Sequence, residues 1–82
     1  MISLGTRWPL GGEPPARVPA EFAAAVADAE QRIREAGVES GSWTLTWLEG
    51  RPIAEFDGET QDGYPTVSVN PATGTPHLTY EQ

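Results

Sequence analysis

Hydrophobic residues recur at helical spacing between positions 19 and 37. Steps of four, three, four and three residues separate Phe22, Val26, Ala29, Ile33 and Ala36. This spacing places the five side chains on one side of an α-helix. Pro19 suits the first turn, where a missing N–H costs nothing, and Gly37 stands where glycine commonly ends a helix. The pattern therefore predicts an amphipathic helix.

The remaining faces of this helix carry charged residues at regular spacing. Asp28 precedes Arg32 by four residues, and Glu30 precedes Arg34 by the same step. Acid-before-base pairs at this distance are typical of a solvated helix face, and each contributes little stability. We expect both pairs to lie in solvent.

From Gly41 onward the hydrophobic period changes from 3.6 to 2. Trp43, Leu45 and Trp47 alternate with β-branched threonines, which favours a strand. A tight turn at Glu49 and Gly50 would fold the next segment back on it. The expected register places Trp43 opposite Phe56, Leu45 opposite Ala54 and Leu48 opposite Arg51, with Pro52 at an edge or beside the turn.

A second hairpin is predicted after an acidic loop at 57–63. Valines 67 and 69 form one alternating strand, and Leu78 and Tyr80 form the other. If Asn70 faces Thr75 across the turn, Val67 faces Leu78. The chain is thus expected to be an α+β protein in which one helix packs on a four-stranded antiparallel sheet made of two hairpins.

The N-terminal segment is rich in proline and glycine. We expect residues 1–18 to form an extended arm, with Ile2 and Leu4 in a short extra strand at most, and residues 19–82 to form a single α+β domain. Trp8 decides the role of the arm. A buried Trp8 would pin the arm to the core, whereas an exposed Trp8 would be a contact residue.

Composition narrows the classes of function. The 82 residues include twelve carboxylates, five arginines and no lysine, for a net charge of −7. Direct nucleic-acid binding rests on cationic side chains and is disfavoured, and a basic protein partner fits better. No signal peptide or membrane span is apparent, which indicates a cytoplasmic address. The lack of lysine beside abundant Ala, Arg, Gly and Pro suggests a bacterial or phage genome.

No residues form a recognised catalytic, cofactor-binding or metal-binding motif. His77 is the only histidine and is expected to be a surface residue. Cysteine is absent, and the loop acids Asp57, Glu59 and Asp62 do not follow the EF-hand spacing. We therefore expect a protein that is not an enzyme and needs no cofactor or metal.

The remaining hypothesis is a small acidic binding or accessory protein, such as an inhibitor, immunity protein or antitoxin, that acts on a basic protein. The alternatives are a homodimer that associates through the sheet edges, and a small-ligand-binding domain or enzyme that uses His77. The residues predicted to contact a partner are Trp8, Glu49, Arg51, Glu55, Asp57, Glu59 and Asp62.

Overall fold

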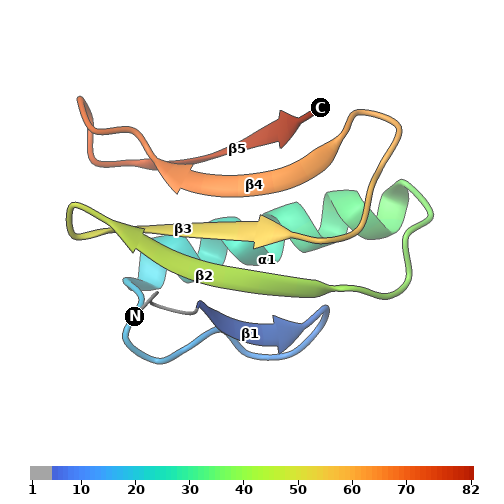
Figure 1. Cartoon of the computed structure of the whole chain (residues 1–82), viewed down its shortest axis with the longest axis horizontal. Coiled ribbons are helices and arrows are strands. Elements are labelled where there is room, and N and C mark those ends of the chain that lie inside the picture. Colours follow the sequence, from blue (N-terminus) through green and yellow to red (C-terminus); the bar gives the residue numbers. More distant parts are fainter. Residues whose placement is uncertain (1–4) are drawn as a thin grey trace.

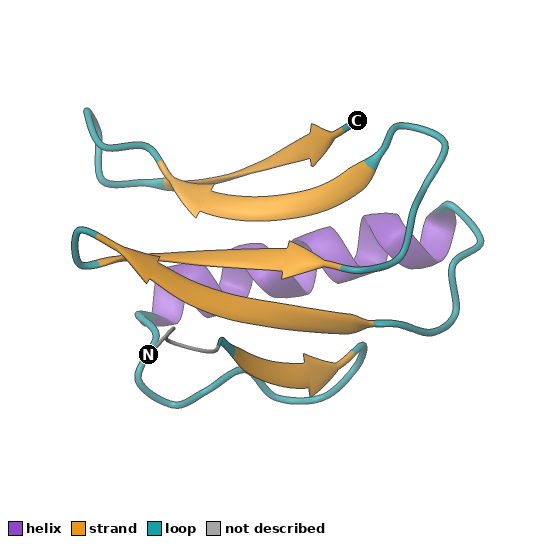
Figure 2. Cartoon of the chain, in the orientation of Figure 1, coloured by secondary structure: helices purple, strands orange, loops and turns teal. Residues whose placement is uncertain are grey.

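In the computed structural model, which describes residues 5–82, one helix lies against a five-stranded antiparallel sheet (Figure 1). The strands follow one another across the sheet in chain order. Along the chain the helix comes between the first and second strands, and in space it lies on one face of the sheet (Figure 2). The elements are β1 (Thr6–Pro9), α1 (Ala20–Glu35), β2 (Ser42–Leu48), β3 (Arg51–Phe56), β4 (Tyr64–Val69) and β5 (Pro76–Glu81).

The α+β class is confirmed, but the prediction of four strands is wrong. The additional strand is β1, which comes from the N-terminal arm and pairs with β2. The proposed short strand at Ile2 and Leu4 lies outside the described residues. The arm thus contributes one edge of the sheet, and after it the N–H of Leu10 donates to the carbonyl of Gly41 at 2.9 Å.

Both predicted hairpin registers are confirmed. Trp43 pairs with Phe56 and Leu45 with Ala54 in the first hairpin, where Pro52 lies one pair from the turn. In the second hairpin Val67 pairs with Leu78, and the N–H of Asn70 donates to the carbonyl of Thr75 at 2.8 Å. The apolar side chains of both hairpins consequently share one face.

Helix α1 begins directly after Pro19, whose carbonyl accepts the N–H groups of Phe22 and Ala23 at 3.0 Å. It ends before Gly37, which has a φ of 90° that suits glycine. Four of the five predicted apolar positions are buried; the fifth, Ala36, caps the helix and is exposed. The helix supplies Phe22, Val26, Ala29 and Ile33 to the core.

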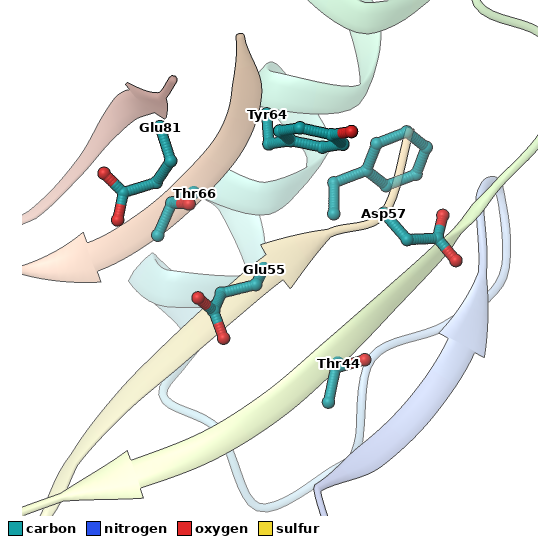
Figure 3. Close-up of a pocket in the computed structure, with 7 residues that line it drawn as sticks. Thr44, Glu55, Asp57, Tyr64, Thr66 and Glu81 are labelled. Carbon is teal, nitrogen blue, oxygen red and sulfur yellow. The ribbon is translucent and has the colours of Figure 1, made fainter. Parts of the chain in front are cut away.

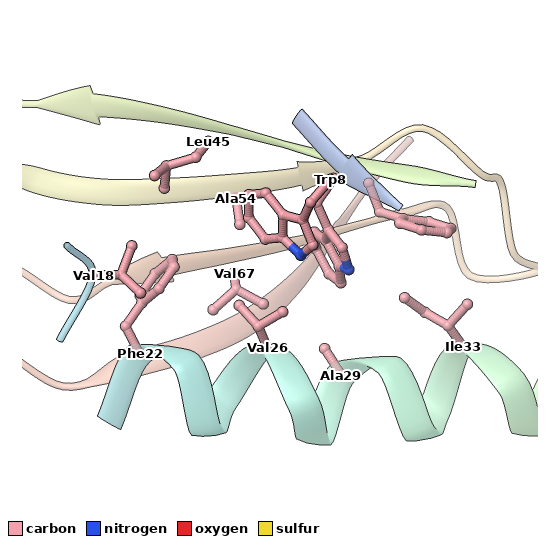
Figure 4. Packing of buried hydrophobic residues seen from close by; sticks show 11 residues of the cluster. Trp8, Val18, Phe22, Val26, Ala29, Ile33, Leu45, Ala54 and Val67 are labelled. Carbon is pink, nitrogen blue, oxygen red and sulfur yellow. The ribbon is translucent and has the colours of Figure 1, made fainter. Parts of the chain in front are cut away.

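The core fills the space between α1 and one face of the sheet (Figure 4). Three aromatic rings from different strands dominate it. The rings of Trp8 and Trp43 stack with centroids 6.3 Å apart, and Trp43 meets Phe56 at 5.1 Å with a tilt of 58°. Aromatic pairs at these distances add stability beyond the area they bury. Trp8 therefore fastens β1 to the core.

The prediction that the charged residues of the helix lie in solvent is wrong for Glu30. Its side chain is buried, and Oε2 accepts hydrogen bonds from the indole N–H of Trp43 and the backbone N–H of Gly11, both at 3.0 Å. Neither predicted helix pair, Asp28 with Arg32 or Glu30 with Arg34, is among the ion pairs found in residues 5–82. Glu30 instead joins the helix, β2 and the arm.

The ladder between β3 and β4 is short. Only two residue pairs, Ala54 with Val67 and Glu55 with Thr66, are in register. Pro65, which would come next, has no N–H to donate to β3. The two hairpins are therefore joined over a short central stretch, and the surface beside each end of it is hollowed.

No helix in the described part of the chain is long and apolar enough to cross a bilayer.

Candidate functional site: the uncovered face of the sheet

One face of the sheet is covered by α1, and the other is not. Because side chains alternate along a strand, the partners of the buried residues point away from the helix. Thr44, Glu55, Thr66 and Thr79 form one row of this second face, each paired with the next across four strands. The uncovered face is therefore polar and rich in hydroxyl groups.

A shallow hollow of about 430 Å³ lies on this face, next to the short ladder between β3 and β4. Figure 3 shows Glu55 and Glu81 on either side of Thr66, with the ring of Tyr64 at one end. We call this hollow the acidic hollow. Its lining residues are Thr44, Glu55, Phe56, Asp57, Tyr64, Thr66 and Glu81.

Glu55 and Glu81 reach the hollow from the two strands that flank β4. Glu55 is opposite Thr66, and Glu81 is opposite Tyr64. The Cα atoms of the two acids are therefore separated by two strand spacings across the sheet and by two residues along it, a distance of roughly 12 Å. Within residues 5–82 neither carboxylate takes part in a hydrogen bond or ion pair between side chains. Both remain available to an external cation.

Asp57 has a different role, although it also lines the hollow. Its Oδ2 accepts from the Arg7 guanidinium at 3.1 Å, and its Oδ1 accepts from the backbone N–H of Ser42 at 2.8 Å. These contacts join the end of β3 to β1 and to the start of β2. The Asp57 carboxylate is thus already engaged by the fold.

Glu59 and Asp62 lie in the loop between the hairpins, and both are exposed. The loop is held by Thr60, whose hydroxyl donates to the carbonyl of Gly63 at 2.8 Å and accepts the N–H of Asp62 at 3.1 Å. Gly63 has a φ of 119°, and a Cβ there would lie 2.5 Å from the carbonyl oxygen of Glu81. Glycine thus lets the loop close against β5.

Glu49 and Arg51 are at the opposite end of β3, where their side chains form an exposed ion pair at 3.0 Å. Six residues of strand separate this turn from Asp57, a distance of roughly 20 Å. The structure therefore does not bring the predicted contact residues into one surface. It places Glu55 and Asp57 at the acidic hollow, Glu59 and Asp62 on the adjoining loop, and Glu49 with Arg51 elsewhere.

Trp8 is 6% exposed and contributes to the core, not to the surface. Trp8 therefore holds the arm against the core and is not an exposed contact residue. The side chain of Arg17 completes the attachment, because its guanidinium lies 5.8 Å from the ring centre of Trp47 and donates to the Thr6 hydroxyl at 3.4 Å.

His77 is exposed on β5, and its Nε2 is 3.3 Å from the hydroxyl of Ser68 on β4. The two residues are direct cross-strand partners. A polar pair at such a position is a normal feature of a sheet surface. In residues 5–82 no three side chains of His, Asp or Glu gather closely enough to hold a metal ion.

Five residues that line the hollow were not predicted as contact residues: Thr44, Phe56, Thr66, Tyr64 and Glu81. Two of them, Tyr64 and Glu81, supply its aromatic ring and its second free carboxylate. Their signal was present in the sequence, because the turn that pairs Val67 with Leu78 also pairs Tyr64 with Glu81 three residues further out. The predicted strand at 67–69 was too short to include position 64. Extending the alternation backwards would have found both.

A second, smaller hollow of about 260 Å³ flanks the other end of the β3–β4 ladder. It is lined mainly by Leu48, Ile53, Val69 and two prolines. Leu48 is 58% exposed. The uncovered face thus has an acidic end and an apolar end.

The chain matches no known protein family, no curated protein and no solved structure.

Proposed function

We propose that this protein is a non-catalytic binding protein, and that it recognises a basic segment of a protein partner on the uncovered face of its sheet. The observation that carries the proposal is the pair of free carboxylates, Glu55 and Glu81, that lie on either side of Thr66 in the acidic hollow. An inhibitor, immunity or antitoxin-like role would use such a surface. The setting proposed for it is the cytoplasm of a bacterium or a phage-infected cell.

The chemistry of the hollow favours a cationic side chain. A lysine or arginine placed between Glu55 and Glu81 would form charge-assisted hydrogen bonds with both. Tyr64 is 40% exposed, and its ring face can attract the same cation. Threonine hydroxyls at 44 and 66 can accept further hydrogen bonds from a guanidinium.

The net charge of the chain supports the same partner. A charge of −7 attracts a basic protein over a distance of about one Debye length and increases the rate of encounter. Glu59 and Asp62 on the adjoining loop extend the negative field beyond the hollow. Glu49 forms an ion pair with Arg51 far from the hollow, and we leave this turn out of the proposed surface.

The test uses immobilised protein and a phage-displayed library of random peptides, selected at low salt. We expect the selected peptides to be enriched in arginine and lysine. The double substitution E55Q/E81Q should weaken binding of a selected peptide by about tenfold or more, as measured by fluorescence anisotropy, because two charge-assisted contacts are lost.

The matched control is E21Q/E39Q, which removes the same charge from two exposed acids outside the hollow. This variant should bind nearly as well as the unmodified protein. An equal loss in both variants would show that only net charge matters, and selected peptides without excess basic residues would refute a basic partner.

A further inference from the structure

Strand β5 forms one edge of the sheet, and among residues 5–82 no further strand lies beyond it (Figure 1). The N–H of Asn70 donates to the carbonyl of Thr75, so the backbone polar groups of Thr75 face β4. Because this orientation alternates along an antiparallel strand, His77, Thr79 and Glu81 also face β4. Leu78 and Tyr80 therefore direct their N–H and C=O groups away from the sheet.

The free edge of β5 has few of the features that normally protect an edge strand. It has six residues, no lysine, and a proline only at its first position, where the missing N–H would point outward. The opposite edge, β1, has four residues and ends in Pro9. Of the two edges, β5 is the better template for an added strand.

The geometry points to a second copy of this chain as that added strand, paired antiparallel through β5 with Thr79 on the two-fold axis. In this register the Leu78 and Tyr80 backbones of the two copies exchange four hydrogen bonds. Leu78 lies beside Tyr80 of the second copy on the helix side, where both side chains are only half-buried in one chain. On the uncovered face, His77 lies opposite Glu81 of the second copy.

Side-chain hydrogen bonds make this register self-complementary. The pair of His77 with Glu81 occurs twice, once on each side of the axis, at non-hydrogen-bonded positions where cross-strand side chains are closest. Nε2 of His77 lies beside Ser68, which leaves Nδ1 for the carboxylate of the second copy. A carboxylate has room for several donors, so Glu81 can also line the hollow.

Neighbouring registers lack these pairs. A register centred on Leu78 would place Tyr80 opposite Pro76, which cannot donate, and would place His77 opposite Thr79. A register centred on Tyr80 would align only the ends of the strands, with Glu81 opposite Thr79. Of the three registers, only the one centred on Thr79 pairs the histidine with an acid and requires no hydrogen bond from Pro76, which has no N–H.

Sedimentation equilibrium of the full chain tests the dimer. H77E places like charges opposite each other at both pairs and should raise the dimer dissociation constant by about tenfold to thirtyfold. The double substitution H77E/E81H exchanges the two residues and should restore dissociation to within about threefold of the unmodified protein. Circular dichroism verifies that each variant remains folded.

Cross-linking tests the register. The chain has no cysteine, and the two Thr79 residues would lie at a distance that a disulfide can span. Thr79→Cys should therefore form a covalent dimer under mild oxidation, whereas His77→Cys, whose two copies would be four residues out of register, should not. An unmodified protein that stays monomeric at high concentration, or equal cross-linking by both variants, would overturn the inference.

Discussion

Glu30 shows how one side chain can link three parts of a small protein. A carboxylate on the buried side of α1 accepts the Trp43 indole N–H and the Gly11 backbone N–H through a single oxygen. Burial of a charged group is costly unless such partners compensate it. The carboxylate in turn satisfies two donors that would otherwise be buried away from water. We therefore expect this position to be much more sensitive to substitution than other acids of the helix.

Glu30→Ala should lower the free energy of unfolding by about 2–4 kcal/mol, because two donors lose their acceptor. Glu30→Gln keeps one acceptor oxygen and should cost roughly half as much. The control is Glu35→Ala, the same change at an exposed position of the same helix, which should alter stability by about 0.5 kcal/mol or less. Urea denaturation followed by circular dichroism measures all three, and equal effects at positions 30 and 35 would contradict the structural role of Glu30.

At the scale of elements, β1 is part of the folded sheet although it comes from a segment without a clear period. Trp8 is its one buried residue, and its stacking on Trp43 fixes the strand against β2. The indole N–H of Trp8 is buried without an acceptor among the described residues, so its contribution comes from packing alone. A truncated side chain at this position should release the arm.

Trp8→Ala should lower the free energy of unfolding by about 3–5 kcal/mol, the usual cost of removing a large aromatic side chain from a core. Trp8→Phe keeps a ring against Trp43 and removes the unpaired N–H, so it should cost much less. Limited proteolysis should cut the arm of the alanine variant first. Unchanged stability in Trp8→Ala would show that the arm is independent of the core.

The sequence predicted the helix and both hairpin registers because each follows from contacts that are local along the chain. A period of 3.6 defines the buried side of α1, and a turn fixes the register of each hairpin. The strand β1 depends on pairing with residues more than thirty positions away, and its four residues are too few to show alternation. Glu30 was misassigned for a related reason, since its donors come from other elements.

The candidate site was predicted only in part. Glu55 and Asp57 do reach the acidic hollow, but charge alone does not distinguish a free carboxylate from one held by Arg7. The hollow itself depends on how the two hairpins join, over two residue pairs that end at Pro65. No local pattern encodes that junction. Tyr64 and Glu81 could be reached only by extending the register of the second hairpin.

At the scale of the whole molecule, the two proposals have a joint consequence. A two-fold axis through Thr79 would run perpendicular to the sheet and join two copies into one sheet of ten strands. Both helices would then lie on one face, and both acidic hollows on the other. Three strand spacings, roughly 14 Å, would separate the two β4 strands at the hollows. A partner with two basic segments could therefore engage both copies.

Two copies of a selected basic peptide joined by a flexible linker should test this arrangement. A glycine- and serine-rich linker of about ten residues has a root-mean-square length of roughly 16–19 Å, which spans the gap. We expect the linked peptide to bind at least tenfold more tightly than the single peptide, because the second contact becomes intramolecular. The gain should disappear in H77E at a protein concentration where this weakened dimer has dissociated, although both carboxylates of each hollow are kept. If the unmodified protein is dimeric and the linked peptide gains nothing, the two hollows cannot face the same side, and the edge pairing must differ from the one inferred.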